Sequence, residues 1–209
     1  MQIAKIRAKN ILSRSKIGSG GYAINPYIGC PHGCIYCYAK FMRGVTGHEE
    51  AWGEFLDVKD FDVASLVKFA ASHGGERVFM SSVTDCYNPH EARFGATRKV
   101  LEALAGSDIN LQILTKSSLI TRDIDLLQTM PNVRVGVSLS VIDEKLRRML
   151  EPRASSIIAR IAAIKKLRAA GVKTYIFVAP ISPQITPVFD IISHYGDAAD
   201  EMWFDRLNL

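Results

Sequence analysis

Apolar, β-rich runs alternate with amphipathic segments along most of the chain, and this alternation constrains the fold more than any other feature of the sequence. The pattern is typical of βα units arranged around a parallel sheet. Six consecutive units predict an α/β fold, a partial open (β/α)6 barrel of the TIM type rather than a closed barrel of eight strands. The strands are expected at residues 22–28, 78–83, 111–115, 133–139, 174–180 and 201–206, with a candidate extra strand at 53–60, and the helices at 63–72, 89–105, 121–130, 156–170 and 186–198.

The segment 156–170 shows helical periodicity most clearly. Ile157, Ile161 and Ile164 recur at steps of three and four residues, whereas Arg160 belongs to the basic positions between them. A helix of this kind covers a sheet with its apolar side. We therefore expect its basic side, including Arg160, to be solvated.

Charge is unevenly distributed along the chain. Residues 1–48 contain seven of the 26 basic residues and none of the 21 acidic ones. We expect a basic N-terminal arm at 1–17 and a core domain at 18–209, with the glycine-rich stretch 18–21 as a flexible connector. A solvated arm is one interpretation of this charge. The other is contact with an anionic partner, either a nucleic acid or an acidic electron donor.

Three of the four cysteines lie within eight residues, at a Cys-x3-Cys-x2-Cys spacing formed by Cys30, Cys34 and Cys37. A structural zinc ion normally has four protein ligands, whereas three cysteines can bind three irons of a [4Fe–4S] cube and leave the fourth iron open. The alternatives are a disulfide-stapled loop and a zinc knuckle completed by His32 or His48. The low cysteine content does not match a secreted disulfide scaffold.

Polar residues follow the predicted strands at the ends where an α/β fold carries its active groups. Thr84 and Asp85 follow the second strand, Lys116 follows the third, and Ser138 lies in the fourth. Serine, threonine and aspartate at such positions also commonly cap the next helix. Lys116 is different, because a lysine at the inner end of a buried strand is costly unless it faces an anion such as a carboxylate.

The cysteine spacing and Tyr36 resemble the radical S-adenosyl-L-methionine (SAM) superfamily, and further motifs resemble its spore photoproduct lyase-like branch, whose members are often described as DNA repair photolyases. The motifs are Asn25–Cys30, Ser82–Asp85, Leu114–Ser117, Leu150–Pro152, Val178–Ile181 and Phe204–Leu209. The resemblance implies a [4Fe–4S] cluster and SAM as cofactors. It also implies reductive cleavage of SAM to a 5′-deoxyadenosyl radical that abstracts hydrogen from a substrate.

The resemblance also implies roles for individual residues. It makes Cys30, Cys34 and Cys37 the cluster ligands, and it puts Tyr36 near the adenine, Thr84 and Asp85 at a SAM contact, Lys116 at a second SAM contact and Ser138 near the ribose.

One departure from the spore photoproduct lyase pattern bears on the reaction. That enzyme uses a cysteine to return a hydrogen atom to the product radical, and Ser82 occupies the matching position here. A serine O–H bond is too strong for this role. Cys86 is the only remaining thiol and therefore the candidate donor, although a small buried residue at a strand–helix junction is the alternative. We expect SAM cleavage but little repair of a spore photoproduct dinucleotide.

Other classes of function remain open at this point: an electron-transfer protein, or a nucleic-acid-binding protein with a structural cluster, in either case without SAM chemistry. The first residues lack the apolar core of a signal peptide, and no stretch is apolar enough to span a membrane. We expect a cytoplasmic enzyme that receives electrons from a reductant such as flavodoxin or ferredoxin. Its substrate is unidentified, with nucleic acid and protein as the candidates.

Overall fold

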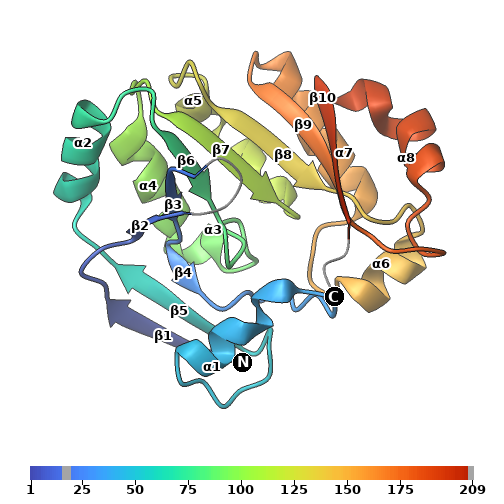
Figure 1. Ribbon diagram of the computed structural model, residues 1–209, viewed down its shortest axis with the longest axis horizontal. Coiled ribbons are helices and arrows are strands. Elements are labelled where there is room, and N and C mark those ends of the chain that lie inside the picture. The colour runs from blue at the N-terminus through green and yellow to red at the C-terminus, as the bar shows by residue number, and fades with distance from the viewer. Residues whose placement is uncertain (16–19, 207–209) are drawn as a thin grey trace.

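The computed structural model describes residues 1–15 and 20–206, and a seven-stranded sheet dominates it (Figure 1). The strand order is β10-β9-β8-β7-β6-β3-β2. All neighbours from β3 to β10 pair in parallel, and β2 adds one antiparallel strand at the edge. The predicted six-stranded open α/β barrel is therefore confirmed. The strands are β2 (Leu12–Arg14), β3 (Tyr22–Ile24), β6 (Arg77–Met80), β7 (Asn110–Thr115), β8 (Arg134–Ser138), β9 (Lys173–Ile181) and β10 (Glu201–Arg206).

Helices follow the parallel strands in the order that the sequence predicts. The α-helices are α1 (Met42–Val45), α2 (Val63–Ser72), α3 (Glu91–Phe94), α4 (Ala96–Leu104), α5 (Ile124–Leu127), α6 (Glu144–Leu150), α7 (Ile157–Ala169) and α8 (Val188–Tyr195), and the 3-10 helices are η1 (Tyr38–Phe41), η2 (Ser118–Asp123) and η3 (Gly196–Ala198). No helix in the described ranges is long and apolar enough to span a membrane.

The main hydrophobic core lies between one face of the sheet and its helices. In β7, Leu111 and Ile113 are buried in this core, whereas Gln112 and Leu114 point to the other face and are less buried. Side chains alternate between the two faces of a strand. Lys116, just after β7, therefore continues the face that lines the open barrel.

Four predicted elements are split. The helix expected at 121–130 falls on η2 and α5, and the helix expected at 186–198 falls on α8 and η3. The expected first strand becomes β3 and β4 (Tyr27–Ile28), which lie in different sheets. Pro26 has no N–H to donate to a ladder, and the Asn25 side chain bonds the loop after β6, donating to Ser82 Oγ at 2.9 Å. The expected helix 89–105 is divided into α3 and α4 at Gly95, whose φ of 62° is left-handed.

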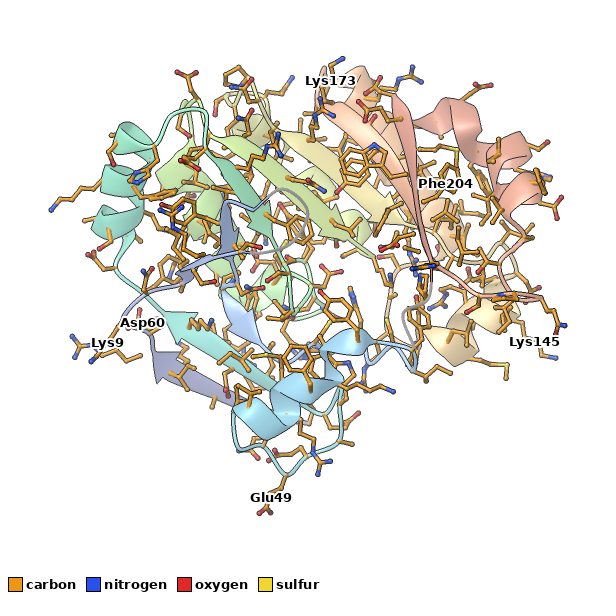
Figure 2. All side chains as sticks on the ribbon, in the orientation of Figure 1. Lys9, Glu49, Asp60, Lys145, Lys173 and Phe204 are labelled. Carbon is orange, nitrogen blue, oxygen red and sulfur yellow. The ribbon has the colours of Figure 1, made fainter. Side chains whose placement is uncertain are left out.

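The N-terminal segment is not the solvated arm that the charge pattern suggests. β1 (Gln2–Arg7) pairs in parallel with β5 (Phe55–Asp60), and β4 completes this second, three-stranded sheet. β5 confirms the candidate extra strand. The basic side chains of β1 remain exposed, and Figure 2 shows Lys9 extending from the ribbon beyond that strand. Part of the expected connector, residues 18–19, lies outside the described residues, and the division of the chain at residue 17 stays a prediction.

Candidate active site at the cysteine loop

The cysteine loop, residues 30–37, lies between β4 and η1. Figure 1 shows α1, which follows η1, on the side of the large sheet toward which the arrowheads of β6, β7 and β8 point. Cys30 and Cys34 are buried and Cys37 is partly buried, and all four cysteines of the chain are free, so the disulfide alternative is wrong. Burial raises the pKa of the Cys34 thiol to about 12, although Lys116 acts in the opposite direction. The loop therefore places three thiols at the edge of the sheet where the carboxyl ends of the parallel strands lie.

Arg153 fixes the shape of this loop from the segment after α6. Its guanidinium donates to the Pro31 carbonyl, to the Gly53 carbonyl at 2.7 Å and to the Glu54 carboxylate at 2.8 Å. Its backbone N–H donates to the His32 carbonyl at 3.3 Å. One side chain thus ties the cysteine loop to the turn that leads into β5.

Two glycines allow the cysteine loop and that turn to touch. A Cβ atom on Gly53 would lie 2.8 Å from the Cα of Gly33 and 2.6 Å from Nη2 of Arg153. Both glycines have positive φ, 64° for Gly33 and 95° for Gly53. A side chain at either position would be strained in its own backbone conformation, and a side chain at Gly53 would also push the two segments apart.

Glu151 is the centre of a buried charged network beside the loop. Its carboxylate, which is 1 % exposed, accepts a hydrogen bond from the Tyr36 hydroxyl and pairs with Arg160, and Lys116 Nζ lies 3.7 Å away. Lys116 Nζ also lies 5.7 Å from the centre of the Tyr36 ring. Burial alone would raise the pKa of Glu151, but Lys116 and Arg160 reverse the shift and lower it. One carboxylate thus faces two cations, which leaves local positive charge next to the cysteines.

The expectation that Arg160 is solvated on the basic face of α7 is wrong, because this side chain is buried. It is 1 % exposed, and its guanidinium donates to the Ser138 and Ser155 carbonyls, each at 2.9 Å, as well as to Glu151. Ile158, by contrast, is 80 % exposed. Helical periodicity could not reveal this inversion, because the partner of Arg160 lies in the preceding segment.

Asp85 joins three segments at the edge of the sheet. Its carboxylate accepts from Thr115 Oγ1 at 2.7 Å and from the Lys116 N–H at 2.8 Å, and it lies 3.2 Å from His32 Nδ1. Burial would raise the pKa of Asp85, but His32 and these donors lower it. Thr84 donates its hydroxyl to the Gly29 carbonyl at 2.5 Å. Asp85 therefore holds the cysteine loop against the end of β7, and Thr84 fixes the residue that precedes this loop.

The two histidines of the zinc alternative have other neighbours. His48 lies between Asp57, at 3.0 Å from Nε2, and Glu50, at 3.1 Å from Nδ1, and its ring stacks on Phe55. His32 faces Asp85. No three His, Cys, Asp or Glu side chains in residues 1–15 and 20–206 converge closely enough to hold a single metal ion.

Ser82 and Cys86 lie on different sides of the loop after β6. Ser82 accepts from Asn25, and its backbone carbonyl accepts from the Tyr38 hydroxyl, so it belongs to the site. Cys86 is fully buried in the main hydrophobic core, where its N–H donates to Ser81 Oγ at 2.8 Å and its carbonyl accepts from Thr97 Oγ1 at 2.6 Å. Burial raises the pKa of its thiol well above the ordinary value. Ser138 is also buried, at the end of β8.

This combination of an open parallel barrel and three cysteines at its carboxyl edge matches a known family. The model of the radical SAM superfamily matches residues 24–184, and the chain belongs to this superfamily. Its members are enzymes that use a [4Fe–4S] cluster and SAM.

The chain is also similar to curated proteins in sequence and to solved structures in fold. An uncharacterized protein of Methanocaldococcus jannaschii is 36% identical over 209 residues, which are 100% of this chain and 79% of that protein. A radical SAM Nα-GlyT isomerase of Pseudomonas phage M6 is 29% identical over 79% of this chain and 34% of the isomerase. A spore photoproduct lyase variant with bound AdoMet and dinucleoside spore photoproduct shares the fold, with a TM-score of 0.75 and 20% identity over 99% of this chain and 62% of the lyase.

The residues present fit an iron–sulfur cluster. Two buried side-chain nitrogens at the cysteine loop make no hydrogen bond in the described part of the chain. His32 Nδ1 still faces the Asp85 carboxylate at 3.2 Å, whereas the Trp52 indole N–H has no acceptor. Buried donors normally find a partner. The unpaired N–H of Trp52 beside three free thiols indicates that the loop is built to surround a group with sulfur or other acceptors.

Proposed function

We propose that Cys30, Cys34 and Cys37 would ligate one [4Fe–4S] cluster and that Lys116 would bind the carboxylate of SAM. When bound, these cofactors supply the 5′-deoxyadenosyl radical that abstracts hydrogen from the substrate. The observation that carries the proposal is the surplus cation at Glu151, where Lys116 and Arg160 share one buried carboxylate next to Tyr36 and Cys34. A second carboxylate would balance that charge.

The chain's own side chains have distinct tasks in this proposal. Burial lowers the pKa of Lys116, but Tyr36 and Glu151 raise it more strongly. The ammonium therefore stays charged and can pair with an anion. Tyr36 is oriented by its hydrogen bond to Glu151, which supports a role of its ring near the adenine. Ser138, held in place through the Arg160 contact to its carbonyl, is proposed to lie near the ribose. Thr84 and Asp85 stay candidates for SAM contacts.

Iron counting on single Cys→Ala variants tests the cluster assignment. Anaerobically reconstituted Cys30→Ala, Cys34→Ala and Cys37→Ala proteins should each lose the cluster. Cys86→Ala is the matched control and should retain it, because Cys86 lies in the hydrophobic core. Loss of the cluster in Cys86→Ala, with full retention in any of the other three, would show that the ligands are assigned incorrectly. Incubation with SAM and dithionite then tests formation of 5′-deoxyadenosine.

The substrate class that the chain supports best is nucleic acid, with protein as the alternative. Lys5, Arg7, Lys9 and Arg14 are exposed, and none forms an ion pair with a carboxylate in the described residues. Such cations are available to phosphates. The phage relative is named a GlyT isomerase, and the lyase structure contains a dinucleoside spore photoproduct. A more distant structure, SuiB of Streptococcus suis, was solved with a precursor peptide.

Repair of spore photoproduct itself is expected to be inefficient. Ser82 stands where the thiol donor belongs, and Cys86 would have to leave the hydrophobic core to replace it. Incubating the wild-type protein with the dinucleotide and measuring thymine tests this. Clean and efficient thymine formation would refute the expectation, and its loss in Cys86→Ala would identify Cys86 as the donor.

Electrons are proposed to come from an acidic flavodoxin or ferredoxin in the cytoplasm, where an oxygen-labile cluster would be kept reduced. Lys40 and Arg43 follow the cysteine loop on the surface, and in the described structure both donate to backbone carbonyls rather than to carboxylates. Their charge is therefore available to an acidic partner.

A further inference from the structure

Trp52 has a buried indole N–H that no other group in the described residues uses. Trp52 Nε1 is buried, yet it has no hydrogen-bond partner in the described part of the protein. Leaving a buried donor unpaired typically costs about 1–3 kcal/mol. A tryptophan that only filled space could be replaced by phenylalanine without this cost, so the position of the N–H calls for an acceptor.

The backbone around Trp52 is held against the cysteine loop. Gly53, the next residue, packs on Gly33 so closely that a Cβ atom on Gly53 would lie 2.8 Å from the Gly33 Cα, and Arg153 bridges the Gly53 and Pro31 carbonyls. The indole is oriented by an edge-to-face contact with Phe55, at 5.8 Å between ring centres and 77° between planes. Trp52 is thus positioned by contacts on both sides rather than by a flexible loop.

The segment against which Gly53 and Arg153 hold Trp52 is the cysteine loop, which carries the free thiols of Cys30, Cys34 and Cys37. None of these thiols forms a hydrogen bond with the indole N–H in the described structure. A thiolate bound to iron is a far better acceptor than a thiol, and hydrogen bonds to such sulfurs are among the factors that set the reduction potential of a cluster.

We propose that Trp52 is a positioning residue for the iron–sulfur centre, and that its indole N–H donates a hydrogen bond to a sulfur of that centre and thereby raises the reduction potential of the cluster. The inference rests on the proposed function, because it needs the cluster that Cys37 helps to ligate. The sign follows from charge: reduction adds an electron to the cluster, and a donor aimed at a ligand sulfur stabilises the more negative state.

The first test is a redox titration of the reconstituted cluster in Trp52→Phe, which keeps an aromatic ring and deletes the N–H. A hydrogen bond of ordinary strength should change the equilibrium constant for reduction by about 2- to 10-fold. Tenfold corresponds to a fall of about 59 mV for a one-electron couple. Trp203→Phe is the matched control, because Trp203, the other tryptophan of the chain, donates to Glu201 in β10 and should leave the potential unchanged.

The second test needs no change at residue 52. In Trp203→Phe protein grown with indole-15N tryptophan, Trp52 is the sole labelled indole, and pulsed EPR of the reduced cluster should detect coupling to its 15N and to an exchangeable proton. A loaded cluster without this coupling, or a Trp52→Phe potential equal to that of the wild type, overturns the inference. Should Trp52→Phe fail to load the cluster, the labelled protein decides the question alone. Failure of the wild type to bind a [4Fe–4S] cluster instead overturns the proposed function, and this inference with it.

Discussion

Arginines have different partners in two segments of the chain, residues 1–48 and residues 98–168. Every arginine between residues 98 and 168 forms an ion pair with a carboxylate, and the pairs are Arg98–Asp123, Arg122–Glu91, Arg134–Glu201, Arg147–Glu144, Arg148–Glu144, Arg153–Glu54, Arg160–Glu151 and Arg168–Asp200. Among the described residues 1–48, none of Arg7, Arg14 and Arg43 has such a partner, and no acidic residue precedes residue 49. Arginines at 98–168 are therefore paired with carboxylates of the chain itself, whereas those in the first 48 residues leave their charge available to a partner.

The largest effect is expected where a paired arginine is most deeply buried. Arg160→Met should lower the free energy of unfolding by about 3–5 kcal/mol, because it leaves the Glu151 carboxylate buried without its closest cation. Arg168→Met, eight residues later on the same helix, removes a pair that is 46 % exposed on the arginine side and should cost about 0–1 kcal/mol. Urea unfolding of both variants measures the difference. Equal losses of unfolding free energy in the two variants would show that burial does not determine how much each ion pair contributes.

Local sequence signals predicted much of the fold for identifiable reasons. The expected strand 201–206 coincides with β10 and the expected helix 63–72 with α2, which Asp62 caps by accepting from the Ala64 N–H at 3.0 Å. The missed helix α6 also had a signal, since Asp143 caps it by accepting from the Leu146 N–H. Alternation, periodicity and capping act over a few residues and can therefore be read directly from the sequence.

Long-range pairing explains what the sequence could not predict. Arg160 falls on the polar side of its helix by spacing, but a carboxylate nine residues earlier, delivered by the turn after α6, draws it inside. Trp52 lies 15 residues beyond Cys37, and nothing in its neighbours indicates the Gly33–Gly53 contact that brings it back to the cysteine loop. The cysteines themselves were found because their spacing is local.

Next in size is the loss of SAM affinity on removing the surplus cation of the buried network. Lys116→Ala should weaken SAM binding by about one to two decades, the effect of a charge-assisted contact worth about 1.5–3 kcal/mol, while the cluster is retained. Equilibrium binding of SAM to cluster-loaded protein is the measurement. Lys165→Ala, on the exposed face of α7, serves as the control. Unchanged affinity in Lys116→Ala would leave the SAM carboxylate without its proposed partner.

A smaller effect is expected from the unpaired cations. If Lys5 and Lys9 each contact a phosphate, the double Lys→Gln variant should reduce the slope of log K against log salt concentration by about 1.8 for duplex DNA. Binding of a DNA duplex at several salt concentrations provides the slopes. Arg134→Gln and Arg168→Gln, both from carboxylate-paired positions, should leave the slope unchanged. If the lysine variant and the arginine variants changed the slope equally, the distinction between unpaired and carboxylate-paired cations would be wrong.

The smallest effect is a pH dependence at the only histidine with two carboxylate neighbours in the described residues. Burial lowers the pKa of His48, but the hydrogen bonds that its ring donates to the Asp57 and Glu50 carboxylates outweigh burial and raise the pKa above the ordinary 6.5. Stabilisation by the charged ring is then fully present below pH 6.5 and is lost as the pH rises through the higher folded-state pKa. Urea unfolding of wild type and His48→Gln should show a difference that shrinks over this range. A difference independent of pH would show that packing on Phe55, not charge, accounts for it.

The bonds of Arg153 to the Pro31 and Gly53 carbonyls have a consequence for the order of events in the maturation of this enzyme. They fix the path of the cysteine loop through protein–protein contacts, so the backbone cost of ordering the loop belongs to folding and not to iron binding. In a zinc finger the metal must arrive before the chain can fold. Here Arg153 ties the cysteine loop to the turn before β5 without using a cysteine, so the energy of cluster binding is not needed to fix this part of the backbone.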